Sequence, residues 1–105
     1  MENIIAVSAG STHTMAITSH GELWAWGDNQ HGQLGDGTTE DRHSPIHIMN
    51  DVVAVSAGSN HTLAVTSDGV LWAWGGNQHG QLGDGTTEDR HSPVRIMEGV
   101  LVPSP

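Results

Sequence analysis

Short apolar runs separated by glycine-containing turns recur along the whole chain. Asp68-Gly69 stands between two such runs, and this pair is a strong signal for a tight hairpin because both residues tolerate positive φ. Glycine, threonine, serine and β-branched residues are too dense in these runs for a stable helix. The pattern therefore predicts short β-strands. In the second half of the chain they cover residues 52–57, 61–66 and 70–74 and, after a polar loop at 75–93, residues 94–97.

The chain is built from a duplicated unit. Aligning residues 4–49 with residues 52–97 needs no gap, and 36 of the 46 paired positions are identical. A fixed period of this length is typical of a solenoid, a propeller or an array. We predict a first repeat at 1–51, a second at 52–99 and the start of a third at 100–105. Such close similarity indicates a recent amplification or a deliberate construction.

The most regular stretch is Leu71-Trp72-Ala73-Trp74-Gly75, which also occurs at 23–27. Because strand side chains alternate, Trp72 and Trp74 project to one face, and Leu71 and Ala73 project to the other. Both faces are apolar, so each sheet should be covered on both sides, and the radially stacked blades of a propeller meet that condition. All four tryptophans are therefore expected to pack between blades: Trp24, Trp26, Trp72 and Trp74.

Two blades cannot close a ring, and each would leave an apolar face open. We therefore predict an all-β fold with two β-propeller blades per chain, each a four-stranded antiparallel sheet, and a ring closed by homo-oligomerisation. The segment Val100-Leu101-Val102 aligns with residues 52–54 and begins a third repeat before Pro103 stops it. It is predicted either to pair with strands of a neighbouring copy or to compete with residues 4–6 for the same place.

The composition argues against several classes of function. Three arginines, no lysine and twelve acidic residues give a net charge of −9, which repels phosphate backbones, so no nucleic-acid partner is expected. No run of about 18 apolar residues and no basic segment at the start are found, so we expect a soluble, cytoplasmic protein without a membrane span or signal peptide. No cysteine is present for disulfides or thiolate metal sites. Eight histidines would make association sensitive to pH near their usual pKa of about 6.5.

Carboxylate and imidazole groups gather in the polar loop of each repeat. Ca²⁺ or Zn²⁺ accepts such ligands, but the spacing fits neither an EF-hand nor a zinc motif. A solvated acidic loop is therefore expected in place of a metal site, and no cofactor is predicted. The weak candidate ligands are Asp36, Asp41 and His43 with their counterparts Asp84, Asp89 and His91, accompanied by Glu40 and Glu88.

Two other features have a structural interpretation. His13 and His61 precede threonine at the start of a strand, and no serine nucleophile with an orienting carboxylate can be assigned beside them. We expect hydrogen-bonded structural imidazoles rather than catalytic bases. The glycine-dense stretch 29–37 lacks the lysine and the following helix of a phosphate loop. Its Asn29 and Gln33 are expected to satisfy loop amides and carbonyls that the sheet cannot reach.

Three motifs occur in both copies. In the second copy they are Gly58-Ser59-Asn60-His61-Thr62, Leu71-Trp72-Ala73-Trp74-Gly75 and Asn77-Gln78-His79-Gly80-Gln81-Leu82-Gly83-Asp84-Gly85. Together they resemble the repeat of the regulator of chromosome condensation family. The resemblance covers nearly the whole chain and implies a propeller, usually of seven blades, whose repeat is offset from the blade so that strands from the two chain ends complete one sheet. Two-repeat chains can close only even-bladed rings, so a trimer with six blades or a tetramer with eight is expected.

The family's activities are expected to transfer poorly. Nucleotide exchange on a small nuclear GTPase is associated with a wedge inserted in the propeller, and chromatin attachment with a basic tail; this sequence has neither. The plant UV-B photoreceptor of the family senses light through tryptophans just after the glycine that precedes His-Thr. This chain has Ser11 and Thr12, or Ser59 and Asn60, at those positions. We expect neither exchange nor light sensing.

Three functional hypotheses remain. The leading one is a non-catalytic, self-assembling propeller scaffold whose partner is a copy of itself. The alternative is a protein-binding module that presents the repeated loops 36–44 and 84–92 around one rim. The third is a metal-dependent hydrolase built on the Asp, Glu and His side chains of those loops. We predict that the chain is not an enzyme.

Overall fold

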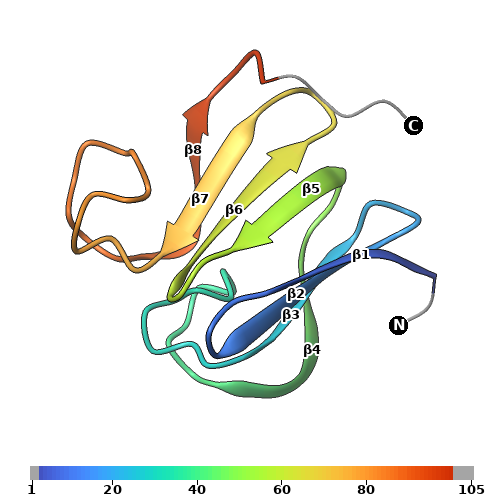
Figure 1. Cartoon of the computed structure of the whole chain (residues 1–105), viewed down its shortest axis with the longest axis horizontal. Coiled ribbons are helices and arrows are strands. Elements are labelled where there is room, and N and C mark those ends of the chain that lie inside the picture. The colour runs from blue at the N-terminus through green and yellow to red at the C-terminus, as the bar shows by residue number, and fades with distance from the viewer. Residues whose placement is uncertain (1–2, 101–105) are drawn as a thin grey trace.

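The computed structural model describes residues 3–100, which form two four-stranded antiparallel sheets side by side (Figure 1). In each sheet the strands follow one another in chain order, so every connection joins neighbouring strands. The first sheet contains β1 (Ile4–Ala9), β2 (His13–Thr18), β3 (Leu23–Gly27) and β4 (Arg42–Met49), and the second contains β5 (Val52–Ala57), β6 (His61–Thr66), β7 (Leu71–Gly75) and β8 (Arg90–Met97).

The two sheets have the same register, as their near-identical sequences require. Met15 pairs with Ala25 across β2 and β3, and the equivalent Leu63 pairs with Ala73 across β6 and β7. The predicted Asp-Gly hairpin is present between β6 and β7, where Gly69 has a φ of +81°. The alternation of side chains therefore places equivalent residues on equivalent faces of both sheets.

The last strand of each sheet begins earlier than the sequence pattern predicts. We expected the fourth strand of the second repeat to begin after Pro93, but β8 begins at Arg90 and runs through that proline. β8 is an edge strand, where a proline is tolerated because one side of the strand needs no ladder hydrogen bonds. The register between β7 and β8 shifts between Ala73 and Gly75, which accommodates the irregular segment.

Each sheet is formed by the four strands of a single repeat. Within residues 3–100 the two chain ends do not share a sheet, which differs from the closure implied by the resemblance. The difference arises because β1 finds its partner in its own repeat: five residue pairs join β1 to β2, and five join β5 to β6. Within residues 3–100 both sheets are therefore complete.

The core is the layer between the two sheets, where β5 lies against β1 and β2. The first sheet contributes one face of β2 and β3, and the second contributes the opposite face of β6 and β7. We call this contact the junction. Its fully or almost fully buried residues are Met15, Ile17, Leu23, Ala25, Leu34, Val52, Ala64 and Trp74.

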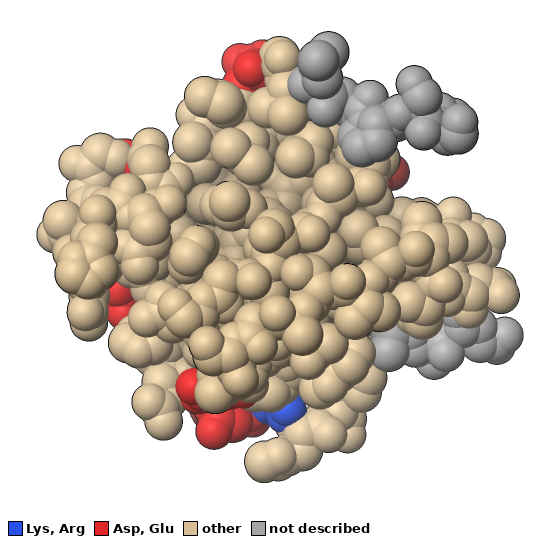
Figure 2. Space-filling view, in the orientation of Figure 1, with Lys and Arg blue, Asp and Glu red and all other residues tan. Residues whose placement is uncertain are grey.

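No helix within residues 3–100 has the length and apolar character needed to cross a membrane. Figure 2 shows one face of the molecule, on which the acidic side chains lie at the periphery.

Candidate assembly interface

The indole of Trp74 is the largest buried side chain at the junction. It is fully buried, and its Nε1–H donates to the carbonyl oxygen of Gln33 in the first repeat over 2.9 Å. The hydroxyl of Thr62 donates to the same carbonyl over 2.8 Å. Two donors from the second sheet thus share one carbonyl acceptor in the first repeat. The buried indole N–H has the hydrogen-bond partner that a buried polar group needs.

Gly35 lies directly against this indole. A Cβ atom at Gly35 would stand 2.7 Å from Trp74 Nε1, and the residue has a φ of +84°. Both the close approach and the left-handed backbone favour glycine. The glycine-dense loop is therefore shaped to receive a tryptophan from the neighbouring sheet.

Further hydrogen bonds cross the junction along its length. The backbone N–H of Val52 donates to the Gly21 carbonyl over 2.9 Å, and the N–H of Ala57 donates to Ser8 Oγ over 2.9 Å. In the loops, His31 Nδ1 lies 3.0 Å from Asp89 Oδ2. The junction therefore combines an apolar layer with a set of specific polar contacts.

His13 supplies another polar contact and has a defined tautomer. Its Nε2 lies 3.1 Å from Thr62 Oγ1. Since the Thr62 hydroxyl proton is directed at Gln33, Nε2 must be the donor and Nδ1 the unprotonated nitrogen. That Nδ1 atom is buried and has no hydrogen-bond partner among residues 3–100. Burial lowers the pKa of His13, against a smaller raising effect of Asp28 and together with a lowering effect of His61.

The pKa of His13 predicts that the fold loses stability as the pH falls below about 6.5. The unfolded chain binds a proton near that value, whereas the folded chain resists protonation, so lower pH favours unfolding. We expect the urea midpoint to fall between pH 7.5 and 5.5, and the fall to be smaller in His13→Gln. An equal pH slope in both proteins would contradict this role for His13. The carboxylates of the loops act in a different pH range. The stability that they contribute to the fold is lost only when the pH falls below about 3.9.

The second sheet carries an open copy of the face that the first sheet buries. Met15, Ile17 and Leu23 are fully buried at the junction. Their counterparts are only half-buried and line an apolar groove of about 210 Å³. Nothing within residues 3–100 covers this groove as the second sheet covers the first. The groove is lined by Ala54, Val55, Ser56, Leu63, Ala64, Val65 and Leu71.

The first sheet carries the complementary open face. Val52 is 2% exposed at the junction, whereas its counterpart Ile4 is 40% exposed. Ile5 and Val7 of the same strand are 64% and 63% exposed. Trp26, the counterpart of Trp74, is only half-buried. The described chain thus contains one complete junction and the two separated halves of another.

The glycines show the same asymmetry. Gly35 touches the Trp74 ring, but a Cβ at its counterpart Gly83 would meet only Ile96 Cγ2, at 3.7 Å. Gly37 donates its N–H to the His91 carbonyl over 2.8 Å. A Cβ at the counterpart Gly85 would meet no described atom within 4 Å. The loop of the second repeat therefore carries the same glycines as the loop that contacts Trp74, but no described tryptophan lies against it.

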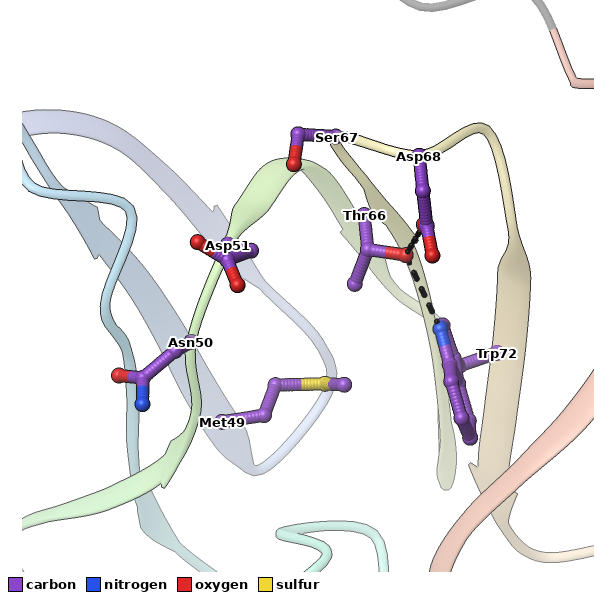
Figure 3. Close-up of a pocket in the computed structure, with 7 residues that line it drawn as sticks. All are labelled: Met49, Asn50, Asp51, Thr66, Ser67, Asp68 and Trp72. Carbon is purple, nitrogen blue, oxygen red and sulfur yellow. Dashed lines mark hydrogen bonds between the residues drawn. The ribbon is translucent and has the colours of Figure 1, made fainter.

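A pocket of about 330 Å³ opens between the sheets on the side of the linker that joins them. Figure 3 shows the Met49 side chain extending from the end of β4 toward Thr66 and Trp72. Trp72 Nε1 donates to Thr66 Oγ1 over 3.2 Å, and Thr66 in turn donates to Asp68. This hydrogen bond from Thr66 lowers the pKa of Asp68. The pocket lies beside the junction: Met49 and Trp72 pack against its apolar layer, whereas the hydrogen bonds among Trp72, Thr66 and Asp68 lie within the second repeat.

The acidic loops are organised around a buried asparagine. The Asn29 side chain donates to Asp36 Oδ1 and to the carbonyls of Thr38 and Glu40, each over 3.0 Å, and its Oδ1 accepts from the Leu34 N–H. Asn77 makes the equivalent set in the second repeat. The expected role of Asn29 in satisfying loop amides and carbonyls is confirmed. Gln33 fulfils its expected role only in part: its Oε1 accepts from the His31 N–H over 2.9 Å, but its buried Nε2 has no hydrogen-bond partner among the described residues.

The predicted metal-ligand candidates are mostly engaged in these loops. Asp36 and Asp84 accept from Arg42 Nε and Arg90 Nε over 2.9 and 2.7 Å. The Arg90 guanidinium holds the pKa of Asp84 well below its usual range. Asp41 and Asp89 accept the backbone N–H groups of Asn29 and Asn77, while His43 and His91 are exposed, as are Glu40 and Glu88.

Within residues 3–100, no three His, Asp or Glu side chains come together as a metal site would require. The part of the chain that the structure describes therefore offers the hydrolase hypothesis no ligand set, and that hypothesis is not taken further.

The other residues singled out from the sequence are divided between the junction and the open faces of the two sheets. Trp74 is fully buried, whereas Trp24, Trp26 and Trp72 are half-buried; Trp24 packs edge-on against His47 with ring centroids 5.5 Å apart. His61 is half-buried, and its buried Nδ1 has no hydrogen-bond partner among the described residues. Val100 is half-buried and donates to the Gly69 carbonyl over 2.9 Å. Leu101 and Val102 lie outside the described residues.

Sequence reasoning missed the contacts of Gln33 and Gly35 with Trp74. Gln33 contributes its backbone carbonyl and Gly35 its bare Cα surface. A signal for Gly35 exists in the glycine density of its loop, but a backbone carbonyl has no sequence signature.

Paired four-stranded sheets with one apolar layer between them define a fragment of a β-propeller. Comparison with known proteins places it in a family. The family model "Regulator of chromosome condensation (RCC1) repeat" matches residues 20–65 and 68–101, and a second model of the same repeat matches 4–33 and 52–81. The chain belongs to the regulator of chromosome condensation repeat family.

Two curated relatives align with about one repeat of the chain. Human E3 ubiquitin-protein ligase HERC2 is 42% identical over 48 residues, which cover 46% of this chain and 1% of that protein. The Arabidopsis thaliana ultraviolet-B receptor UVR8 is 47% identical over 45 residues, covering 43% of this chain and 10% of the receptor. The alignments thus span a small part of these relatives.

Solved structures match the fold over both sheets. Prp20p from Saccharomyces cerevisiae, whose binding to Gsp1p and histones has been described, superposes with a TM-score of 0.82 at 21% identity, covering 90% of this chain and 26% of Prp20p. Human WBSCR16 gives a TM-score of 0.73 at 28% identity, covering 90% of this chain and 25% of that one. The chain thus spans about a quarter of these propellers.

Proposed function

We propose that the chain is a non-catalytic propeller unit that assembles with copies of itself, head to tail, into a closed symmetric ring. The observation that carries this proposal is the internal junction. At this junction one face of the first sheet packs against one face of the second sheet. The counterparts of these two faces are open on the second and on the first sheet, respectively. Because the repeats are nearly identical, the open face of the second sheet fits the open face of a first sheet.

The internal contacts specify the contacts between copies. Trp26 of the next copy would donate to the Gln81 carbonyl, as Trp74 does to the Gln33 carbonyl within the chain. His79 would meet Asp41 of the next copy, as His31 meets Asp89. Each such junction would bury the half-exposed apolar side chains of two faces, and burial of this kind is the main driving force of association.

The proposed contact between copies is heterologous, because it joins two different surfaces. A head-to-tail interface produces a ring when its rotation closes and a filament when it does not. Each chain supplies two blades, so the ring is even-bladed, and we propose a trimer or a tetramer. A closed ring leaves no apolar blade face in solvent.

The native mass of the particle across a dilution series tests this function. We expect three or four times 11.1 kDa at micromolar concentration, with dissociation on dilution. A well-folded monomer at all concentrations would overturn the proposal, because the open faces would then be stable in water.

A matched pair of glycine substitutions separates this interface from general damage. Gly83 and Gly85 have φ values of +80° and +83°, so alanine is strained at both. In the ring, a Cβ at Gly83 would collide with Trp26 of the next copy, as a Cβ at Gly35 would with Trp74. A Cβ at Gly85 would meet far less, since its counterpart Gly37 has only Ser92 Oγ at 3.6 Å. We expect Gly83→Ala to shift the mass toward the monomer, and Gly85→Ala to assemble like the parent.

The family's fold is also consistent with a protein-binding module, the alternative function. Prp20p of Saccharomyces cerevisiae has been described as binding Gsp1p, histones and Kap60. In this chain the exposed carboxylates of Glu40 and Glu88 are the groups a protein ligand would meet on the repeated loops. Retention of every pull-down partner by the Glu40→Ala, Glu88→Ala double variant would count against this role.

A further inference from the structure

The pocket beside the linker between the two sheets has an acidic rim. Its volume is about 330 Å³, which lies at the lower end of the range for small-molecule sites. Its lining contains two carboxylates, those of Asp51 and Asp68, and no described lining residue is basic. Asp51, Ser67 and Asp68 are all exposed. Negative charge therefore stands at the mouth of the pocket.

The inner wall of the pocket is apolar and aromatic. Met49 and Trp72 are half-buried, and Thr66 is buried. In Figure 3 the Met49 side chain reaches from the end of β4 toward Thr66 and Trp72. The only donor of the indole, its Nε1–H, is already used on Thr66. What remains for a ligand is the apolar body of the ring, whose π face attracts positive charge.

The Asp68 carboxylate is ionised at neutral pH and held in place. The hydrogen bond from the Thr66 hydroxyl is the main cause that lowers the pKa of Asp68, and the charge of Arg95 lowers it further. Arg95 has its own partner, because its Nη2 lies 2.7 Å from Glu98 Oε2. The Asp68 charge is therefore left available on the side of the pocket.

The equivalent turn of the first repeat lacks these features. His20 stands there in place of Asp68. The indole of Trp24, the counterpart of Trp72, is packed edge-on by His47 with ring centroids 5.5 Å apart. Among residues 3–100 no aromatic ring packs on Trp72 in this way. An open indole beside two carboxylates thus occurs in the described chain only at the internal pocket.

From this combination we infer that the pocket binds a small amphipathic organic cation, a primary or methylated alkylammonium group. Its apolar part packs between Met49 and Trp72, and its charge lies between Asp51 and Asp68. The net charge of −9 favours the approach of such a cation. Free amines and the lysine side chains of a protein share this chemistry. All the lining residues belong to one chain, so the site does not require the proposed ring.

Titration of the folded chain with hexylammonium tests this site, with hexanol as an uncharged probe of the same length. NMR of isotope-labelled protein follows the indole N–H of Trp72. We expect its resonance to shift and saturate with hexylammonium, and to shift much less with hexanol. Equal binding of the two probes would overturn the inference, because the carboxylates would then have no role. Absence of hexylammonium binding at millimolar concentration would overturn it too.

Two substitutions remove the charges without disturbing the backbone. In Asp68→Asn an asparagine before Gly69 keeps a favoured hairpin turn. In Asp51→Asn the new residue tolerates the left-handed φ of +61° at this position. Each should weaken hexylammonium binding about fivefold, the upper range for an exposed ion pair. Undiminished binding by the double variant would contradict the site.

Asp28→Asn is the matched control for these variants. It removes the same charge from the loop after β3, at the far end of the strands from the pocket (Figure 1). We expect this variant to bind hexylammonium as the parent does. An equal weakening in Asp28→Asn and Asp68→Asn would overturn the inference, because the cation would then respond only to the overall charge.

A third probe, Nα-acetyl-lysine amide, distinguishes the two sources of the cation. Its side chain ends in the same ammonium group, but it also carries the backbone amides of a protein residue. Binding tighter than that of hexylammonium would support a lysine side chain of a protein as the occupant. Weaker but charge-dependent binding would support a free amine.

Discussion

Trp74→Ala is expected to lower the free energy of unfolding by about 3–5 kcal/mol, the usual cost of truncating a buried tryptophan. Trp74 is fully buried at the centre of the only apolar layer within residues 3–100. Its removal deletes the contact with Gly35 and one of the two donors to the Gln33 carbonyl. A loss of this size is a large part of the stability of a small domain.

Urea denaturation at a concentration where the parent is monomeric measures this effect, because assembly would otherwise add to apparent stability. Trp26→Ala is the matched control. It removes the same side chain from the same motif, but Trp26 is only half-buried. We expect a clearly smaller loss for Trp26→Ala. Equal losses in the two variants would contradict the asymmetric burial.

The strands could be predicted from the sequence because their signals are local. Alternation of apolar side chains and the Asp-Gly turn depend on a few neighbouring residues. The start of β8 could not be predicted, because the pattern takes a proline as a strand boundary. Whether Pro93 interrupts or joins a strand depends on that strand being at the edge of its sheet.

The burial of each tryptophan is a different kind of problem. The segments 23–27 and 71–75 are identical, so no local property can distinguish Trp26 from Trp74. The difference arises only from chain position: the second sheet has the first beside it, whereas the outer face of the first sheet has no described neighbour. Sequence reasoning assigned all four tryptophans the same packing role. That role requires a neighbouring blade for each sheet face, and assembly would supply it.

The acidic loops show how far residue type can mislead. Carboxylates and imidazoles at this density indicate possible cation ligands, yet Asp36 and Asp84 are held by arginine and asparagine from their own loops. The Asn29 and Asn77 contacts reach 5 to 11 residues along the chain. A spacing rule for metal motifs cannot anticipate this internal use of the charges.

Trp26→Ala is expected to abolish the ring at micromolar concentration while leaving a folded monomer. In the proposed assembly each Trp26 enters a junction between copies in the way Trp74 enters the internal one. Loss of about 3 kcal/mol weakens one such contact by roughly two orders of magnitude. A ring contains one of these contacts for every subunit, so the loss recurs at each of them.

Sedimentation or mass photometry of the parent and Trp26→Ala at matched concentrations measures this loss. Trp26→Phe serves as the graded control, because it keeps an aromatic ring above Gly83 of the neighbouring copy but removes the indole N–H and one of the two fused rings. We expect Trp26→Phe to assemble more weakly than the parent and more strongly than Trp26→Ala. A full-size particle from Trp26→Ala would mean that the copies do not meet through the surfaces that the internal junction displays, because an indole fully buried at every contact cannot be removed without weakening it.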